Sequence, residues 1–158
     1  MIEKILSGKN IRRATQQVVT NQGSSGVDGM RVSALSTHLK TNWERITTAI
    51  RNETYYPQAI LGVEIPKSNG KTRLLGIPTV VDRLLQQAFH QVISPKFELE
   101  FKEHSYGFRP NRNAHQALQQ AQKNIHEGYD YIVDIDLKSF FDEVDHGILL
   151  ELLYNKVN

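Results

Sequence analysis

The segment YIVDIDLKSFFD at residues 131 to 142 places two carboxylates at the end of an apolar, β-prone run. Side chains of a strand alternate between its faces, so Asp134 and Asp136 point to one side and the apolar residues beside them to the other. Two carboxylates on one face repel each other unless a cation neutralises them, and hard oxygen ligands suit Mg2+. The pattern predicts a magnesium site, although solvated aspartates at a strand end explain an isolated Asp-x-Asp equally well.

A second group of charged side chains flanks the dipeptide Asn69-Gly70. Residues 61 to 66 and 73 to 77 alternate in hydrophobicity, and Asn-Gly between two such runs predicts a β-hairpin. The hairpin would return Lys67 and Arg73 to the same tip, where a point charge and a bidentate guanidinium suit a triphosphate. From the spacing alone, a solvated charged tip is the simpler alternative.

The remaining elements are predicted to be helices with one apolar face each. Spacings of three and four residues mark these faces, at Ile11, Ala14, Val18 and Val19, then from Leu35 to Ile50, and again from Ala114 to Ile125. A long buried helix is predicted from Val80 until Ser94-Pro95 breaks it, and another amphipathic helix begins at Ile148. Gly23 and Gly128 are the predicted helix stops.

Composition limits the class of protein. With 158 residues, 39% of them apolar, the chain can bury one core or two small ones. No apolar run reaches the length of a membrane span, the N-terminus lacks a secretory signal, and a cytoplasmic location is the default expectation. The absence of cysteine excludes disulfides, thiolate zinc sites and cysteine nucleophiles.

Charge is distributed unevenly along the chain. Up to Arg73 there are eleven Lys plus Arg against five Asp plus Glu, a net charge of +6, and the remainder has eight against twelve, a net charge of −4. A basic segment followed by an acidic one suits a protein that holds a polyanion on one part and metal ions on another. Solvated surface charge accounts for the asymmetry almost as well.

Four sequence blocks, in order, resemble the N-terminal part of a group II intron reverse transcriptase, also called an intron-encoded maturase. These blocks are NQGSSGVDGM, IPKSNGKTRLLGIPTVVDRLLQQA, SYGFRPNRNAHQAL and YIVDIDLKSFFDEVDH. They are similar to that family's N-terminal extension loop, its fingers hairpin with the following helix, its next block and its first palm motif. Retron and CRISPR-associated reverse transcriptases share some of the blocks, so they are the alternative subfamilies.

The resemblance implies roles for the residues of the last block. Asp136 matches the family's first catalytic aspartate and Mg2+ ligand, with the Leu137 backbone carbonyl as a further ligand, while Asp134 is left with a supporting role. Phe141 matches the aromatic that packs under the incoming sugar and excludes a 2′-hydroxyl. The residues expected to contact the incoming nucleotide are Lys67, Arg73, Ser139, Phe140 and Phe141, the backbone amides of Ser139 and Phe140 facing the triphosphate.

Contacts with the RNA template are expected at two further places. The GFRP block resembles a family element near the template, which implies RNA contacts for Arg109, Arg112 and Asn113, but a buried arginine pair fits the same residues. The loop GSSGVDGM would lie over the template like a lid, with Gly26 and Arg31 as the expected contacts and backbone N–H groups as donors.

One feature of the family is missing from these residues. Reverse transcriptases carry a second palm motif, a Tyr-x-Asp-Asp turn that supplies the other metal-binding carboxylates, and no such turn occurs here. A two-metal site therefore stays incomplete, and we expect the chain to be a fragment without polymerase activity of its own. Two other function classes remain: a haloacid-dehalogenase-type phosphatase, disfavoured because only 22 residues follow Asp136, and a non-catalytic RNA-binding module.

The expected fold is α+β, a reverse-transcriptase fingers region with a partial palm that is mostly helical, with a β-hairpin and an incomplete antiparallel sheet. The expected divisions are an N-terminal extension with the lid loop at 1–32, fingers at 33–128 and the start of the palm at 129–158. The expected partners are template and intron RNA, a DNA primer and dNTP, and no membrane. Unpaired edges of the palm strand would also favour a homodimer.

Overall fold

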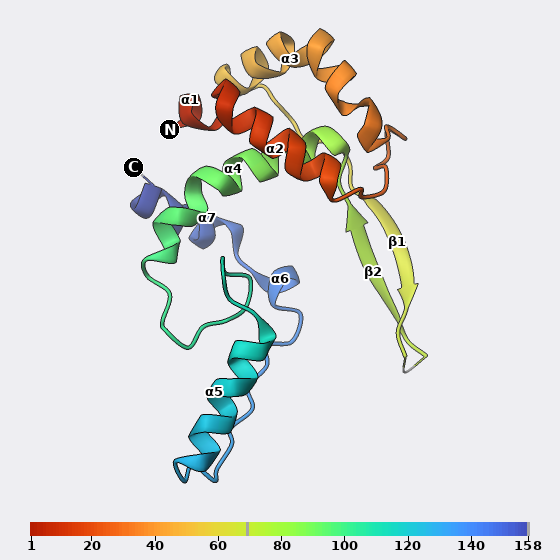
Figure 1. Ribbon diagram of the computed structural model, residues 1–158. Coiled ribbons are helices and arrows are strands. Elements are labelled where there is room, and N and C mark those ends of the chain that lie inside the picture. Colours follow the sequence, from red (N-terminus) through yellow and green to blue (C-terminus); the bar gives the residue numbers. More distant parts are fainter. Residues whose placement is uncertain (69, 158) are drawn as a thin grey trace. The chain divides into compact units, whose positions relative to one another are not determined.

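The computed structural model describes residues 1–68 and 70–157, and the chain forms two compact units, Met1–Ser94 and Pro95–Asn158 (Figure 1). The first unit contains α1 (Ile2–Ile5), α2 (Gly8–Thr20), the 3-10 helix η1 (Val32–Ala34), α3 (Leu35–Arg51), β1 (Leu61–Pro66), β2 (Thr72–Ile77) and most of α4 (Val80–Glu98). The second contains the end of α4, then α5 (Ala114–His126), α6 (Phe140–Glu143) and α7 (His146–Val157).

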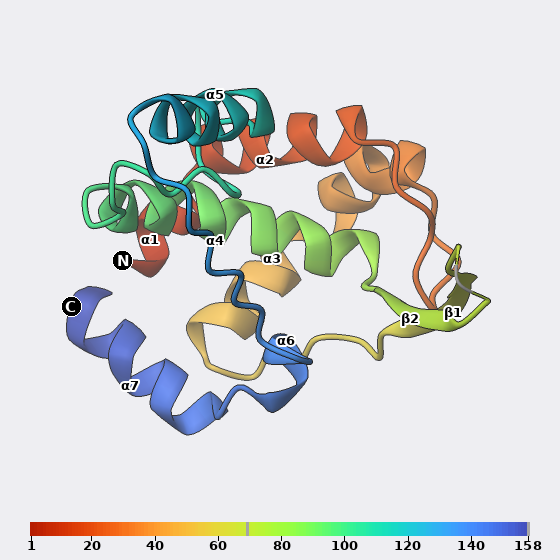
Figure 2. The ribbon, with the colours of Figure 1, turned by 90° about the horizontal axis from the view of Figure 1, so that it is seen from below.

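Helices α2 and α4 pack side by side and antiparallel in the first unit (Figures 1 and 2). Asn10, near the start of α2, donates from its side-chain amide to the Ala88 carbonyl in the middle of α4 at 2.9 Å. The Gln91 side-chain amide donates in turn to the Asn10 side-chain oxygen at 2.8 Å. These amide contacts fix the axial position of one helix against the other.

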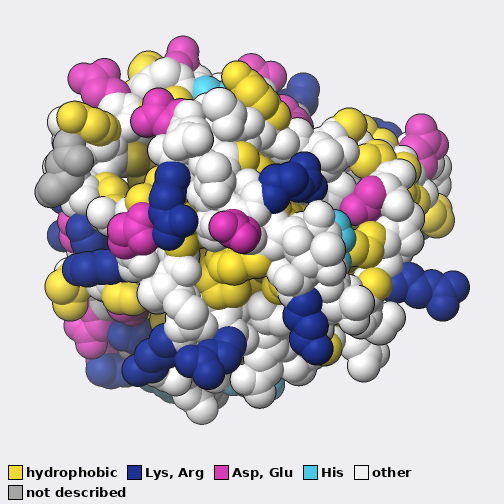
Figure 3. Space-filling model, turned by 90° about the horizontal axis from the view of Figure 1, so that it is seen from above, with side chains coloured by type: hydrophobic (Ala, Val, Ile, Leu, Met, Phe, Trp, Pro, Cys, Tyr) yellow, Lys and Arg dark blue, Asp and Glu magenta, His cyan; other side chains and the backbone are white. Residues whose placement is uncertain are grey.

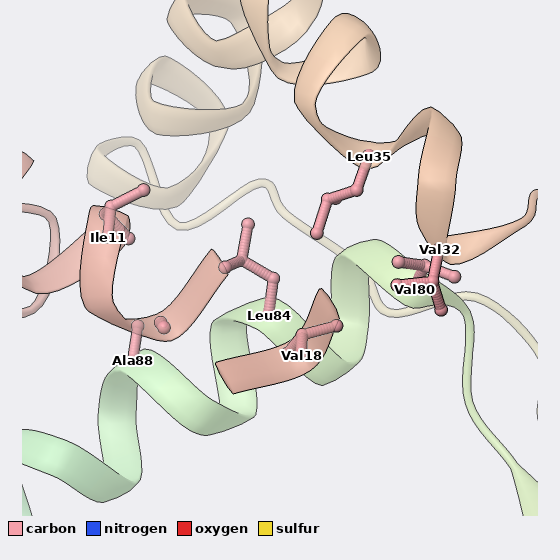
Figure 4. Close-up of a cluster of buried hydrophobic side chains, with 8 residues drawn as sticks. Ile11, Val18, Val32, Leu35, Val80, Leu84 and Ala88 are labelled. Atoms are coloured by element: carbon pink, nitrogen blue, oxygen red, sulfur yellow. The ribbon is translucent and has the colours of Figure 1, made fainter. Parts of the chain in front are cut away.

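A single apolar cluster joins these two helices to η1 and α3 (Figure 4). Its members are Ile11, Ala14, Val18, Val32, Leu35, Val80, Leu84 and Ala88. Leu35 and Leu84 are fully buried, and each such side chain stabilises the fold by about 1.5–3 kcal/mol. The predicted apolar face of α2 is confirmed except at Val19, which is exposed because it lies 100° round the helix from Val18.

A buried carboxylate fastens the segment after α3 to the first turn of α4. Asp82 accepts hydrogen bonds from the Tyr55 hydroxyl at 2.6 Å, the Thr79 hydroxyl at 2.6 Å and the Gln58 N–H at 3.1 Å. Both carboxylate oxygens therefore have partners, as a buried charge requires. The contact determines how the chain enters the hairpin.

Strands β1 and β2 form the predicted antiparallel hairpin, with Leu61 opposite Ile77 and Ile65 opposite Arg73. The Gly70 N–H donates to the Lys67 carbonyl at 3.1 Å, and Gly70 adopts a φ of +77°, which glycine tolerates best. Asn69, the other half of the predicted turn dipeptide, lies outside the described residues.

The predicted break at Ser94-Pro95 is wrong, because α4 continues through Pro95 to Glu98. Proline removes one backbone donor from a helix, but the φ that its ring enforces is itself helical. With less than two turns of helix remaining after Ser94, the loss of one hydrogen bond does not end the element. The boundary between the two compact units nevertheless falls at this peptide.

The α+β class is confirmed, but the predicted palm strand at 131 to 136 is not part of a sheet. Among the described residues the β1–β2 hairpin is the only sheet, and residues 131 to 137 carry no strand assignment. A strand is defined by the hydrogen bonds of a neighbour, and the described part of the chain supplies none here. Side chains on both sides of this segment are exposed, so the predicted division into a wet and a buried face is also absent.

Helices α5 and α7 confirm the two predicted C-terminal helices, and Gly128, at a φ of +94°, follows the end of α5 as predicted. None of the helices formed by residues 1–68 and 70–157 combines the length and hydropathy of a membrane-spanning segment.

The half-buried hydroxyl of Tyr55 predicts a pH dependence of stability. Burial, and secondly the hydrogen bond to Asp82, raise the pKa of Tyr55 above its ordinary value. A pKa raised on folding gives a contribution to stability that is complete below about pH 10 and is lost as the pH rises toward the folded value.

We therefore expect the free energy of unfolding, measured by urea titration, to fall more steeply above about pH 10 in the natural chain than in a Tyr55→Phe variant. Tyr154, which is exposed, provides the matched Tyr→Phe control. Identical pH slopes for the natural chain and the Tyr55→Phe variant would contradict this assignment.

Candidate active site

Residues 135 to 142 surround an open hollow of about 670 Å3 in the second unit. Its lining residues are Ile135, Asp136, Leu137, Ser139, Phe140, Phe141 and Asp142. The structure thus brings the predicted metal ligand, the predicted carbonyl ligand and three predicted nucleotide contacts to one concavity. Asp134 is not among these lining residues, and its supporting role stays a prediction.

The hollow exists because the backbone turns sharply at Ser139. This residue adopts φ +50° and ψ +35°, a left-handed conformation that costs a non-glycine residue about 1–2 kcal/mol. Its carbonyl then accepts the N–H groups of Asp142 at 2.9 Å and Glu143 at 3.1 Å, which starts α6. Backbone strain of this kind is concentrated at functional sites.

The turn presents two aromatic rings in different environments. Phe140 and Phe141 lie edge to face, with ring centroids 5.3 Å apart. Phe141 is 86% exposed and Phe140 51% exposed, so Phe141 is the ring more open to a ligand.

The donor set fits part of a magnesium shell but does not complete one. No group of three His, Cys, Asp or Glu side chains able to hold a metal occurs among residues 1–68 and 70–157. Mg2+ in nucleotide enzymes is commonly held by one or two carboxylates together with substrate phosphates and water. Asp136 and the Leu137 carbonyl match that protein contribution in kind.

Asp142 is a second carboxylate in the hollow and received no role from the sequence. Its distance of six residues from Asp136 does not match the helix repeat, and a turn and the start of α6, not a continuous strand, connect the two residues. The turn at Ser139 brings the residue to the hollow, and this turn carries none of the usual glycine or proline signals.

The hairpin forms as predicted, and its register places Lys67 and Arg73 on one of its faces. Arg73 is paired with Ile65, and Lys67 lies two residues beyond Ile65, so the alternation of side chains puts both cations on the same side. Both side chains are exposed. They belong to the first unit and Asp136 to the second, and the convergence of the three on one nucleotide stays a prediction.

Arg109 is held by groups within its own unit. Its guanidinium donates to Glu98 Oε1 at 3.0 and 2.7 Å, to the Lys102 carbonyl at 2.7 Å and to the Ser105 carbonyl at 3.0 Å. The side chain is only 7% exposed and lies over the Phe101 ring at 5.1 Å. These contacts favour the buried-pairing alternative, and an RNA contact by Arg109 stays untested.

The neighbours of Arg109 also have intramolecular partners. The Arg112 guanidinium lies 5.5 Å from the centre of the Tyr106 ring. Asn113 caps α5: its side chain accepts the Gln116 N–H at 3.0 Å, and the Gln116 side chain accepts the Asn113 N–H at 2.9 Å. Such a reciprocal capping box stabilises a helix start by about 0.5–2 kcal/mol.

The predicted lid loop is anchored to α4 at its middle. A Cβ added at Gly26 would lie 2.8 Å from the Cα and the N of Thr79, so only glycine fits there. The Arg83 guanidinium donates to the Ser24 carbonyl at 2.7 Å. Arg31 is exposed, but Gly26 itself is buried, and neither RNA contact is tested by these distances.

The predicted charge asymmetry does not produce one continuous basic surface in the view of Figure 3. Lys and Arg side chains on that face are interspersed with Asp and Glu and with hydrophobic groups. Any attraction for a polyanion there depends on local groups of cations and falls off over about 10 Å at 0.1 M salt.

Comparisons with known proteins agree with the sequence blocks. A sequence model described as reverse transcriptase (RNA-dependent DNA polymerase) matches residues 65–156. Protein YkfC of Escherichia coli K12 is 33% identical over 137 residues, covering 84% of this chain and 36% of the relative. The group II intron-encoded protein LtrA of Lactococcus lactis subsp. cremoris is 33% identical over 145 residues, covering 91% of this chain and 24% of the relative.

A plant relative, nuclear intron maturase 1 of Arabidopsis thaliana mitochondria, is 30% identical over 93 residues, which cover 57% of this chain and 13% of the relative. The chain therefore spans about a third or less of the length of these curated relatives.

Replacing Arg109 with lysine should loosen the loop between α4 and α5. Lysine keeps the charge but has no planar fork, so the two hydrogen bonds to Glu98 Oε1 and the two carbonyl bonds cannot all form. We expect a loss of about 1–3 kcal/mol of local stability, seen as faster hydrogen exchange of amides 99–112.

The Arg112→Lys variant is the control, because Arg112 makes a ring contact rather than this set of hydrogen bonds. Unchanged exchange rates in the Arg109→Lys variant would show that the Glu98 pair does not organise the loop.

Proposed function

This chain belongs to the reverse transcriptase (RNA-dependent DNA polymerase) family and matches group II intron-encoded members of it, and from that premise we propose its part in catalysis. It supplies the fingers and the first palm carboxylate of an enzyme that copies RNA into DNA. The observation that carries the proposal is the hollow at residues 135 to 142, where a carboxylate and an open aromatic ring lie together.

The Asp136 carboxylate and the Leu137 carbonyl would hold Mg2+ in the proposed reaction. Such an ion would supply activation of the primer 3′-hydroxyl and stabilisation of the leaving pyrophosphate. The Phe141 ring packs under the sugar and excludes a 2′-hydroxyl by contact. The Ser139 and Phe140 amides face the triphosphate, while Lys67 and Arg73 neutralise it.

The proposed partners are an RNA template, a DNA primer, dNTP and the intron RNA itself. The relatives' printed names describe intron-encoded proteins and an intron maturase, and the first half of this chain has the net positive charge that such a polyanion attracts. Exposed Arg31 and half-buried Arg112 are the side chains of the predicted RNA set best placed to reach a phosphate.

A non-catalytic RNA-binding module is the second candidate for these residues by themselves. The incomplete carboxylate set among residues 1–68 and 70–157 favours it over an independent polymerase. Both candidates use the same basic first half, and they differ in whether the hollow around Asp136 binds a metal ion.

Metal binding to the isotope-labelled chain tests the hollow. Mn2+ takes oxygen ligands much as Mg2+ does and broadens the NMR signals of nearby groups. We expect Mn2+ to broaden amide signals of residues 135 to 142 first, and the effect to disappear in an Asp136→Asn variant.

Asp130→Asn is the matched control, since it removes the same charge from an exposed aspartate outside the hollow. Broadening that is the same in the natural chain and in the Asp136→Asn variant would end the metal assignment.

Primer extension on an RNA template with Mg2+ and four dNTPs should give no product with these 158 residues. Efficient extension would contradict the incomplete site, and salt-sensitive RNA retention without metal binding would favour the second candidate.

Pairing between two copies through residues 131 to 137 is the proposed oligomeric contact. Tyr131, Ile132 and Val133 are all more than four-fifths exposed, and strand-like segments with free backbone groups associate readily. We expect light scattering to detect a dimer whose fraction rises with concentration and falls in an Ile132→Lys variant. A monomer at all concentrations in both proteins would exclude this contact.

A further inference from the structure

An apolar pocket of about 370 Å3, the α1 pocket, opens in the first unit between α1, the end of α3 and α4. Its apolar wall is formed by Ile2, Ile5, Leu6, Ile50, Leu85 and Phe89. Small-molecule sites in proteins have volumes of this order and are mostly apolar, with a few polar groups that orient the ligand. The described lining residues are all distinct from those proposed above for the metal ion, the nucleotide and the RNA.

Hydrogen bonds hold the walls of the α1 pocket together. The Asn10 side-chain amide donates to the Ile5 carbonyl at 2.8 Å and to the Ala88 carbonyl at 2.9 Å, which fastens the end of α1 to α4. The Arg51 guanidinium donates to both carboxylate oxygens of Glu3, at 2.8 and 3.1 Å, which ties α1 to the end of α3. Because these walls are already held in place, a ligand loses little affinity to ordering them.

The polar side chains of the α1 pocket offer acceptors to a ligand. Tyr55 and Asp82 are among the lining residues, and the Tyr55 hydroxyl donates its proton to Asp82 at 2.6 Å. The Tyr55 oxygen therefore has only lone pairs left for another partner, and the carboxylate of Asp82 has nothing but acceptor oxygens. A ligand that reaches either group must bring an N–H or O–H donor.

The α1 pocket is poorly suited to an ionised ligand. A charged group that enters it loses its water against apolar walls, which is costly unless an ion partner is present. Among the described lining residues Asp82 is the only Asp, Glu, Lys or Arg, and its two oxygens already accept three hydrogen bonds. The rings of Tyr55 and Phe89 favour a flat aromatic ligand, because offset and edge-to-face ring contacts add to the burial of apolar area.

We propose that the α1 pocket binds an uncharged two-ring aromatic molecule with one N–H or O–H donor, of the chemical class of indole. An enclosed apolar cavity of about 150 Å3 takes up benzene, so a pocket of about 370 Å3 has room for two fused rings. The rings fill the apolar space, and the donor meets Tyr55 or Asp82. Since Asp82 also fastens the segment that leads into the hairpin, the bound molecule stabilises that connection.

Titration of indole into the methyl-labelled 158-residue chain tests the proposal. We expect saturable shifts of the methyl signals of Ile2, Ile5, Ile50 and Leu85, with a Kd of about 1 mM or below. Benzofuran has the same two-ring outline but an oxygen in place of the N–H, and it should bind about threefold to tenfold more weakly. Shifts without saturation, shifts centred elsewhere, or equal affinities for the two compounds would overturn the proposal.

A Leu85→Gln variant places a polar group in the apolar wall and should weaken indole binding about fivefold. Leu74→Gln is the matched control, because Leu74 is an exposed leucine of β2 outside the α1 pocket, and this variant should stay within about twofold of the natural chain. Equal weakening in the two variants would count against the site. The comparison of indole with benzofuran uses the natural chain, so it decides the question even if Leu85→Gln lowers stability.

N-acetyl-leucinamide, titrated in parallel, represents an apolar side chain of a protein partner. It should bind more weakly than indole, because it has no ring to lie against Tyr55 and Phe89. Tighter binding of N-acetyl-leucinamide than of indole would assign the α1 pocket to a protein contact and overturn the small-molecule assignment.

Discussion

Hydrogen bonds between strands fix the position of the hairpin that carries Lys67 and Arg73. Among the described residues, no strand does the same for the segment that carries Asp136. Along β1 and β2 the backbone groups of one strand meet those of the other, so the register alone determines where Lys67 and Arg73 project. Residues 131 to 137 have the composition of a strand, but no described residue pairs with them. The backbone N–H and C=O groups of these residues therefore hydrogen-bond to water. The direction of the Asp136 carboxylate therefore depends on local turns and not on a sheet.

Local patterns predicted the elements whose formation depends on neighbours in sequence. The apolar spacing of α2, α3 and α5 follows the helix repeat, and alternating residues around a glycine turn give the hairpin. Leu35 and Leu84 are buried as those patterns require. The predicted helix break at Pro95 was wrong, because the effect of a proline on a helix depends on how many helical hydrogen bonds remain beyond it.

The parts that sequence left open depend on contacts between distant residues or on single backbone angles. Arg109 pairs with Glu98, eleven residues away in the sequence. No periodic pattern in the sequence indicates this pair, so the sequence could not decide between a phosphate contact and a buried pair for Arg109. The Asp82 contacts with Tyr55 and Gln58 join separate elements in the same way. Of the residues at the candidate site, the sequence predicted Asp136 and Phe141 but not Asp142. Asp142 reaches the hollow through the left-handed turn at Ser139, and no glycine in the sequence indicates that turn.

The close approach of Gly26 to Thr79 has a mechanical consequence. Pro78 and Thr79 form the connection between the end of β2 and the start of α4, so the base of the hairpin and the middle of the N-terminal loop rest on the same two residues. A bulkier side chain at position 26 would push on the peptide that sets the hairpin's angle. Two segments some fifty residues apart in sequence are thereby in backbone contact, so a larger residue at position 26 would displace one of them.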